Sequence, residues 1–393
     1  MEFAPLGPLE SVVVLIDCKE SLSEAISPEV KGYIIGPLRC LVISCLVISQ
    51  CRFGLPMSTE TMSVEEEARV VEQILQGRDR ISSELSKVII GQHDVIEQLL
   101  ISLFAGGHCL ITGAPGLAKT LLVQSVSQIF HLKFQRIQFT PDLMPADITG
   151  TEILEQDSDG RRNLQFVQGP IFANVILADE INRTPPKTQA ALLEAMQEHQ
   201  VTAAGRRYQL EEPFFVLATQ NPIEMEGTYP LPEAQLDRFM FNVMIDYLPP
   251  EDELAVVMQT TSRRAEAIQP LFTGEDVVRF HEAVRKVPIA EEVAAYAVRL
   301  AAATRPGRDG VPEFINEWVS WGAGLRAAQT LVLGSKARAL LNGNAHVSLD
   351  DIKALAHPTL RHRVLLSYKA EAEGISIEDV VDRLLTTVSS ASN

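Results

Sequence analysis

The chain has 393 residues, of which 46% are hydrophobic, and its 34 basic and 51 acidic residues give a net charge of −17. This length exceeds one typical domain, so we expect two or more packed units with apolar cores. The acidic balance argues against a protein that binds duplex nucleic acid through a basic face. Four of the five cysteines precede residue 52, and none has zinc-like spacing to histidine, which favours reduced thiols in a cytoplasmic protein.

Residues 1–62 differ from the rest of the chain because they carry none of the motifs described below. An apolar run of about twelve residues, bracketed by Arg39 and Arg52, is shorter than the roughly 20 residues that span a bilayer. It also lies too far from Met1 for an ordinary signal peptide. We interpret it as a strand or a collapsed segment. Alternatively, the functional protein begins at Met57 or Met62, and residues 1–62 are a disordered extension or a start-site artefact.

Residues 63–248 alternate between helical and strand patterns, which predicts an α/β domain with helices covering a mostly parallel sheet. Helices are expected over residues 64–86, 92–105, 120–129 and 187–199. Strands are expected over residues 109–112, 133–139, 175–178, 214–218 and 240–245. Two insertions are typical of β-hairpins, one over residues 153–167 with its turn at Asp159 and Gly160, and one over residues 200–210 with its turn near Gly205.

Residues 113–120 read Gly-Ala-Pro-Gly-Leu-Ala-Lys-Thr and stand between an apolar run and a helical pattern. This order is typical of a phosphate-binding loop, in which backbone N–H groups and a helix N-terminus surround a phosphate. Lys119 would place a cation beside the β- and γ-phosphates of ATP, and the Thr120 hydroxyl would bind Mg²⁺. Ala118 replaces the usual glycine. We expect the first helical turn to tolerate it, because only positions with positive φ require glycine.

Two later strands end in polar side chains. The strand at 175–178 delivers Asp179 and Glu180. We expect Asp179 to hold Mg²⁺, directly or through water, and Glu180 to polarise the attacking water. The strand at 214–218 leads to Asn221, which could orient that water or contact the γ-phosphate. An acidic pair at a strand end is often only a capping feature. In order with the phosphate-binding loop, these residues predict hydrolysis of ATP with Mg²⁺.

After Pro249 and Pro250 the pattern changes to helices without strands. These helices are expected over residues 251–264, 276–287, 290–304, 314–318, 325–341 and 349–366. Thr273 and Ser348 are candidates to begin two of the helical regions through capping boxes. We expect residues 249–393 to form a small helical lid and tail, with the lid closing over the nucleotide at the domain boundary.

Five separated motifs resemble the MoxR family of AAA+ ATPases, and the resemblance extends over roughly residues 64–375. The motifs are residues 113–120, 138–150, 179–196, 218–222 and 236–239. Ala118 belongs to the family pattern. The resemblance implies an AAA+ P-loop NTPase with a five-stranded parallel core sheet, two β-hairpin insertions and a C-terminal helical lid, assembled as a hexameric ring.

The resemblance also assigns roles to matching residues. Asn221 is similar to the sensor-1 residue, and Arg238 to the arginine finger that reaches the nucleotide of a neighbouring subunit. Arg326 resembles the sensor-2 arginine of the lid, although the preceding Gly-Leu replaces a frequent Ser-Pro. For both arginines the alternative is a surface salt bridge. The implied nucleotide contacts are Gly113, Ala114, Pro115, Gly116, Leu117, Ala118, Lys119, Thr120 and Leu121, with Val88, Ile89, Ile90 and Gln92 around the adenine.

These observations predict a Mg²⁺-dependent ATPase that remodels or matures protein complexes. Family analogy implies a chaperone-like role, sometimes in inserting metal cofactors, with a partner that bears a von Willebrand factor A domain. One alternative is a nucleic-acid-dependent motor, because Arg161, Arg162, Arg206 and Arg207 at the hairpin tips would suit phosphates. Another is a nucleotide-regulated scaffold that does not hydrolyse ATP, which the intact Glu180 disfavours.

Overall fold

The computed structural model describes residues 64–114, 116–156, 162–221, 227–262 and 266–388, all of which belong to one compact unit. The predictions for residues 1–62 therefore lie outside the described residues. Among the described helices, none combines the length and apolar character needed to cross a membrane.

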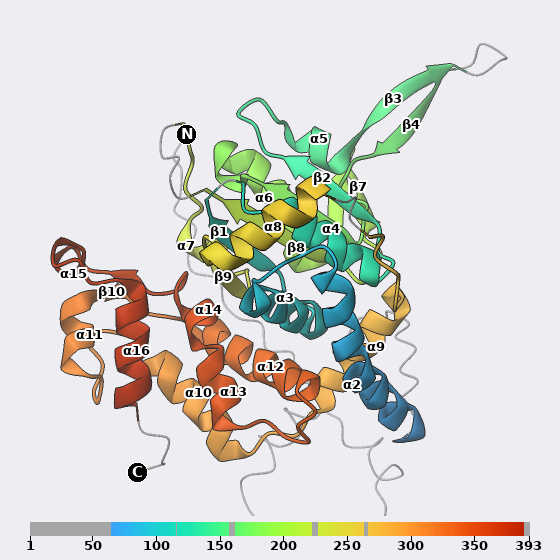
Figure 1. Ribbon diagram of the computed structural model, residues 1–393. Helices are drawn as coiled ribbons and strands as arrows, with labels where there is room; N and C mark the ends of the chain where they lie inside the picture. Colours follow the sequence, from blue (N-terminus) through green and yellow to red (C-terminus); the bar gives the residue numbers. More distant parts are fainter. Residues whose placement is uncertain (1–63, 115, 157–161, 222–226, 263–265, 389–393) are drawn as a thin grey trace, which may run out of the picture. The chain divides into compact units, whose positions relative to one another are not determined.

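A parallel sheet forms the centre of the α/β part (Figure 1). It has five strands in the order β2-β5-β8-β1-β9. Its strands are β1 (Cys109–Gly113), β2 (Phe134–Gln138), β5 (Val175–Asp179), β8 (Phe215–Gln220) and β9 (Phe241–Ile245). Every neighbouring pair is parallel, which confirms the predicted sheet. Because all carboxyl ends share one edge, the polar residues that follow β1, β5 and β8 are brought together there.

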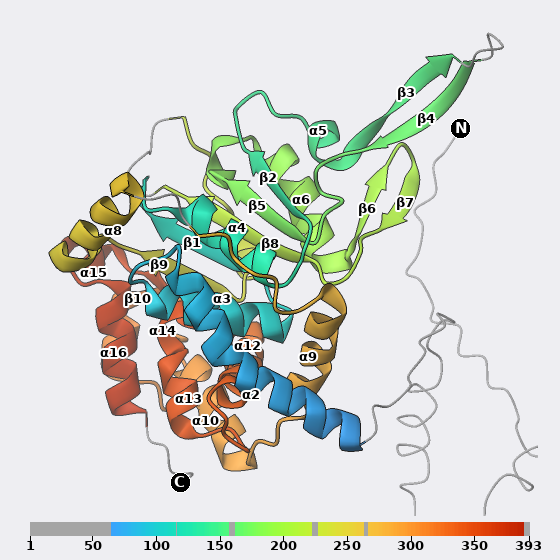
Figure 2. The same cartoon turned by 45° about the vertical axis from the view of Figure 1, so that its right-hand side comes forward.

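Two apolar cores occupy the opposite faces of this sheet. Cys109 and Ile111 of β1 belong to one core, whereas Leu110 belongs to the other, as strand alternation requires. The first core includes buried residues of α2 (Val64–Ser86), α3 (His93–Ala105) and α4 (Lys119–Ile129). The second is closed by α5 (Pro145–Thr149) and α6 (Pro186–Glu198), so that helices cover both faces (Figure 2).

Both predicted hairpins are present. The first pairs β3 (Gly150–Gln156) with β4 (Arg162–Gln168) and extends away from the sheet (Figure 2). Its turn, including Asp159 and Gly160, lies outside the described residues. The second pairs β6 (Gln200–Ala203) with β7 (Arg206–Gln209). The rings of Phe166 and Tyr208 stack with centroids 4.3 Å apart, which joins the two hairpins.

The C-terminal part is mainly helical, but the prediction that it has no strands is wrong. Its longer helices are α8 (Pro250–Ser262), α9 (Gly274–Lys286), α10 (Glu291–Ala303), α12 (Leu325–Leu341) and α16 (Ile377–Thr387), and its shorter ones are α11 (Glu313–Trp318), α13 (Leu349–Ala354), α14 (Ala356–Leu360) and α15 (Tyr368–Ala372). Two short strands, β10 (Val319–Trp321) and β11 (Leu365–Leu366), pair antiparallel. Strands of three and two residues are too short to leave a period-two pattern in the sequence.

The predicted single helix over residues 349–366 is also wrong. It divides into α13 and α14 and is followed by β11. Pro358 explains the division at Leu355, because proline has no N–H to donate to the carbonyl oxygen of Ala354 and its ring crowds that carbonyl. By contrast, the predicted capping boxes at Thr273 and Ser348 are confirmed, and Ser376 forms another at the start of α16.

The buried guanidinium of Arg363 attaches the helical part to the α/β part. Its Nε donates to Asp237 Oδ1 at 2.7 Å, and its Nη2 donates to the carbonyl oxygen of Phe239 at 2.7 Å. Asp237 follows α7 (Glu233–Leu236) directly. Charge-assisted hydrogen bonds satisfy a cation whose burial would otherwise be costly. Arg363 therefore fixes the segment that carries the neighbouring Arg238.

A second polar cluster holds α16 against α14, and it predicts a pH-dependent stability. His357 contacts Glu378 at 2.5 Å and Asp382 at 3.0 Å, and these contacts raise the pKa of His357 above its ordinary value. The stabilisation is therefore complete below about pH 6.5 and is lost as the pH rises through the raised pKa. We expect the stability advantage of the wild type over His357→Gln to fall by on the order of 1 kcal/mol between pH 6 and pH 9. Thermal unfolding of both proteins across that range measures it, and a pH-independent difference would contradict it.

Candidate functional site

A cavity of about 550 Å³ lies at the carboxyl ends of the central strands. It is lined by Gly116, Leu117, Ala118, Lys119, Thr120, Leu121, Arg136, Asp179, Glu180, Thr219 and Asn221. The structure thus brings together most of the predicted phosphate-binding loop, both predicted carboxylates and Asn221. Open α/β sheets commonly bind ligands at this edge.

Close approach of the backbone explains the first glycine of the loop. A Cβ atom on Gly113 would lie 2.3 Å from the carbonyl oxygen of Ile245 on the neighbouring strand β9. Strand β1 pairs with β9 up to this point, so neither backbone can move aside easily. Gly116 is required for a different reason, because its φ of +84° suits glycine best.

The explanation predicted for Ala118 is wrong. Ala118 is the N-cap of α4 and has a φ of 56°, so it lies in the left-handed region rather than in the first helical turn. A non-glycine residue in this conformation costs roughly 1 kcal/mol or more. The chain tolerates this strain where it turns from the loop into α4. Phosphate-binding loops usually have glycine at this position, and that preference indicates that the position needs a positive φ.

Lys119 begins α4, and its ammonium group lies on the cavity wall. Its Nζ donates to the carbonyl oxygen of Gly113. Burial lowers the pKa of Lys119 below its ordinary value, against the opposing effect of the nearby Asp179 and Glu180. Thr120 follows at the same helix N-terminus. The wall therefore combines a cation, a hydroxyl and backbone donors, which are the groups that a phosphate-binding loop uses.

The hydroxyl of Thr219 on β8 links the two carboxylate residues at the end of β5. It donates to Asp179 Oδ1 at 2.6 Å and accepts from the backbone N–H of Glu180 at 2.8 Å. Glu180 has a φ of 57°, and this turn directs the chain away from the strand into a short 3₁₀ helix. Its Oε2 accepts from Gln138 Nε2 and Arg183 Nη1, each at 3.0 Å.

Three further residues of this site had no role predicted from the sequence. Arg136 and Gln138 lie on β2, and Thr219 lies on β8; all three bond to the carboxylates. Gln138 and Thr219 belong to two of the motifs that resemble the MoxR family, but their place in those motifs did not predict what they contact. The contacts arise because β2 and β8 flank β5 in the sheet. These contacts could not be predicted without the order of the strands in the sheet.

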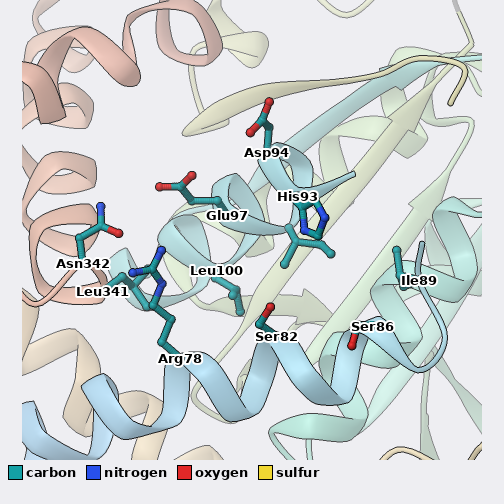
Figure 3. A pocket seen from close by; sticks show the side chains of 11 residues that line it. Arg78, Ser82, Ser86, Ile89, His93, Asp94, Glu97, Leu100, Leu341 and Asn342 are labelled. Carbon is teal, nitrogen blue, oxygen red and sulfur yellow. The ribbon is translucent and has the colours of Figure 1, made fainter. Parts of the chain in front are cut away.

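The residues predicted around the adenine do not line this cavity. Ile89 instead lines a smaller pocket between α2 and α3, toward which Arg78, Glu97 and Asn342 also point (Figure 3). The neighbouring loop contacts the start of α8, since a Cβ atom on Gly91 would lie 2.9 Å from both Asp252 and Leu248 side chains. The roles of Val88, Ile89, Ile90 and Gln92 remain predictions.

Comparison with known proteins establishes the family. Residues 108–241 match the model of the ATPase family associated with various cellular activities (AAA), and residues 315–384 match the AAA lid domain. The chain is 42% identical over 311 residues to a Mycobacterium tuberculosis protein named Chaperone MoxR1, covering 79% of this chain and 81% of that one. This chain belongs to the MoxR family of AAA+ ATPases.

Two further similarities support the same family and fold. Protein MoxR of Methylorubrum extorquens is 30% identical over 328 residues, which cover 79% of this chain and 94% of the relative. A crystal structure of a candidate ATPase from Cytophaga hutchinsonii superposes with a TM-score of 0.76 at 43% identity, covering 83% of this chain and 97% of the other. These similarities confirm the predicted MoxR resemblance and the AAA+ fold with a helical lid.

Two arginines that the MoxR resemblance singles out lie outside the cavity lining. Arg238 Nη1 donates to the carbonyl oxygen of Leu193 at 2.6 Å. Arg326, at the N-terminus of α12, lies 3.7 Å from Asp237 Oδ2. This second contact is the salt bridge that was the alternative interpretation of Arg326. Within one chain, therefore, neither arginine belongs to the group that surrounds Asp179 and Glu180.

Proposed function

We propose that this MoxR-family protein binds ATP with Mg²⁺ in the cavity beside Lys119 and hydrolyses the γ-phosphate bond. The observation that carries the proposal is the shared cavity of Lys119, Asp179 and Glu180, with Thr219 bonded to both acidic residues. The donor types fit the ligands, because Lys119 and backbone N–H groups suit phosphate. The Thr120 hydroxyl and the Asp179 carboxylate suit Mg²⁺.

Each residue has a defined task in this proposal. Lys119 neutralises phosphate oxygens, while Thr120 and Asp179 hold the metal. Glu180 polarises the attacking water, and Asn221 on the same wall orients it. Bound Mg²⁺ supplies further neutralisation of the charge that develops during phosphoryl transfer. Positioning and electrostatics therefore account for most of the acceleration.

We further propose that hydrolysis drives chaperone-like remodelling of a protein client by a ring of subunits. The relative named Chaperone MoxR1 supports the role, and the long hairpin offers a contact surface. Leu154 and Leu164 stand opposite each other on this hairpin, and their exposed fractions are 60% and 67%. Exposed apolar side chains in one place are typical of a binding surface. A hexameric ring, and a partner with a von Willebrand factor A domain, are proposed from the family resemblance.

A nucleic-acid motor is the second candidate. Arg162, Arg206 and Arg207 are exposed on the hairpins, while Arg161 lies outside the described residues. However, two acidic residues accompany Arg162 on the long hairpin, the partly exposed Glu152 and the exposed Glu155. Nearby carboxylates weaken the attraction of a phosphate backbone, so the hairpins favour a protein client over nucleic acid.

Phosphate release by the purified protein separates these functions. We expect Mg²⁺-dependent ATP hydrolysis, abolished by chelation of the metal, whose rate changes by less than about two-fold when single- or double-stranded DNA is added, since DNA-coupled motors need extended basic contacts. Strong stimulation by DNA would favour the nucleic-acid motor. Nucleotide binding without turnover, in assembled protein, would favour the scaffold.

A further inference from the structure

Both carboxylate oxygens of Asp179 already have partners. Oδ1 accepts from Thr219 Oγ1 at 2.6 Å, and Oδ2 accepts from Arg136 Nε at 3.0 Å and Nη2 at 2.6 Å. A Mg²⁺ ion needs oxygen ligands at about 2.0–2.1 Å and keeps near-octahedral geometry. Direct coordination by Oδ2 is therefore incompatible with the present two-pronged contact of Arg136.

The position of Arg136 lets it move without disturbing the core. It lies on β2, which is the edge strand of the sheet, and 47% of its side chain is exposed. The Asp179 side chain is only 16% exposed, so the carboxylate stays where β5 places it. Displacement would expose the guanidinium to water, which solvates an arginine side chain well at the rim of a cavity.

Arg136 also connects Asp179 to Glu180. Its Nη2 donates to Gln138 Oε1 at 2.5 Å, and Gln138 Nε2 donates to Glu180 Oε2 at 3.0 Å. Arg136 and Gln138 are two residues apart on one strand and therefore face the same side of the sheet. A change at the metal-binding carboxylate is thus transmitted to the carboxylate that would polarise water.

The charge of the cavity shows what Arg136 contributes. Its lining residues include two cations, Lys119 and Arg136, and two carboxylates, Asp179 and Glu180. Without Arg136 the lining would have one excess negative charge. Nucleotide phosphates would then be repelled until a metal ion arrived, because charges interact strongly in a partly desolvated cavity.

We propose that Arg136 is an exchangeable counter-ion of Asp179. It neutralises this carboxylate in the absence of metal, is displaced by Mg²⁺, and links that exchange through Gln138 to the orientation of Glu180. Arg136 is thus a positioning residue that adjusts the metal requirement of nucleotide binding. The inference rests on the proposed function, since it assumes that ATP or ADP binds in this cavity.

The test is the Mg²⁺ dependence of nucleotide binding, which needs no turnover. Arg136→Met keeps much of the side-chain length and removes the charge. The affinity for a fluorescent ADP analogue is measured in a chelator and across a Mg²⁺ titration. Without metal, we expect the variant to bind roughly ten-fold more weakly than the wild type. The Mg²⁺ concentration that restores half of the full affinity should fall several-fold, because no guanidinium competes for Asp179.

Arg279→Met is the matched control. The Arg279 side chain has a similar exposure, 50%, and it pairs with Asp276 on α9, outside the cavity lining. It should leave the Mg²⁺ midpoint at the wild-type value. Arg136→Lys, which keeps the charge but loses the two-pronged contact, should give a midpoint between those of the wild type and Arg136→Met. This variant also serves if Arg136→Met fails to fold.

Two results would overturn the inference. One is a Mg²⁺ midpoint that neither Arg136 variant changes. The other is an equal loss of affinity with and without metal, which would make Arg136 a simple phosphate ligand or a structural residue. Failure of the wild type to bind nucleotide at any Mg²⁺ concentration would instead overturn the proposed function. The wild-type titration therefore distinguishes the two failures.

Discussion

Glu180→Gln should keep ATP binding and lose turnover by about 10²- to 10⁴-fold, the usual contribution of a general base. The amide has almost the same shape as the carboxylate, and its oxygen can still accept from Gln138 or Arg183. It lacks the basic oxygen that the attacking water requires. Phosphate release measures turnover, and calorimetry or a fluorescent nucleotide measures binding.

Two further variants are compared with Glu180→Gln. Lys119→Ala should weaken ATP binding itself, because it removes the cation beside the phosphates. Glu194→Gln, an exposed acid-to-amide change on the outer side of α6, should leave both binding and turnover at wild-type values. Loss of binding together with turnover in Glu180→Gln would show that Glu180 maintains the structure of the loop rather than the chemistry.

The central sheet was predictable because its strands are short apolar runs that end in motif residues. The buried run of β5 leads directly into Asp179, so the pattern indicated both the strand and its functional end. The backbone conformation of Ala118 could not be predicted from such patterns. Its left-handed φ is set by how the loop meets α4, and residue type alone favoured the opposite conclusion.

The contacts around Asp179 depend on strand order, which no local pattern contains. Arg136 reaches Asp179 because β2 pairs with β5, although 43 positions separate the two residues. Thr219 reaches it from the other side because β8 pairs with β5. Similarly, β10 and β11 are joined across the helical part by a pairing that neither short segment predicts alone.

Arg238 lies outside the nucleotide cavity of its own chain. The half-buried guanidinium bonds to the Leu193 carbonyl oxygen. Asp237, the preceding residue, is fixed by Arg363 and faces Arg326 from the helical part. We therefore propose that Arg238 is held in a fixed position and acts on the nucleotide of a neighbouring subunit, as the MoxR resemblance implies.

Arg238→Ala should therefore lower ATP hydrolysis by roughly 10³- to 10⁵-fold, the contribution typical of an arginine finger, while each subunit still binds ATP. The specific activity of the wild type should rise with protein concentration as subunits associate. Arg279→Ala removes a half-exposed arginine that pairs with Asp276 on α9, and it should retain wild-type activity. Thermal unfolding of both variants separates lost catalysis from lost folding, since the bond to Leu193 is also removed.

Mixing two inactive proteins tests whether Arg238 acts between subunits. Glu180→Gln retains Arg238, and Arg238→Ala retains Glu180, so some interfaces of a mixed assembly combine an intact Glu180 with an intact Arg238. These interfaces should restore part of the activity, most when the two proteins are mixed in equal amounts, once co-assembly is verified by mass measurement. A monomer whose specific activity is independent of concentration would contradict the proposal directly, because an isolated subunit has no neighbour to supply the arginine.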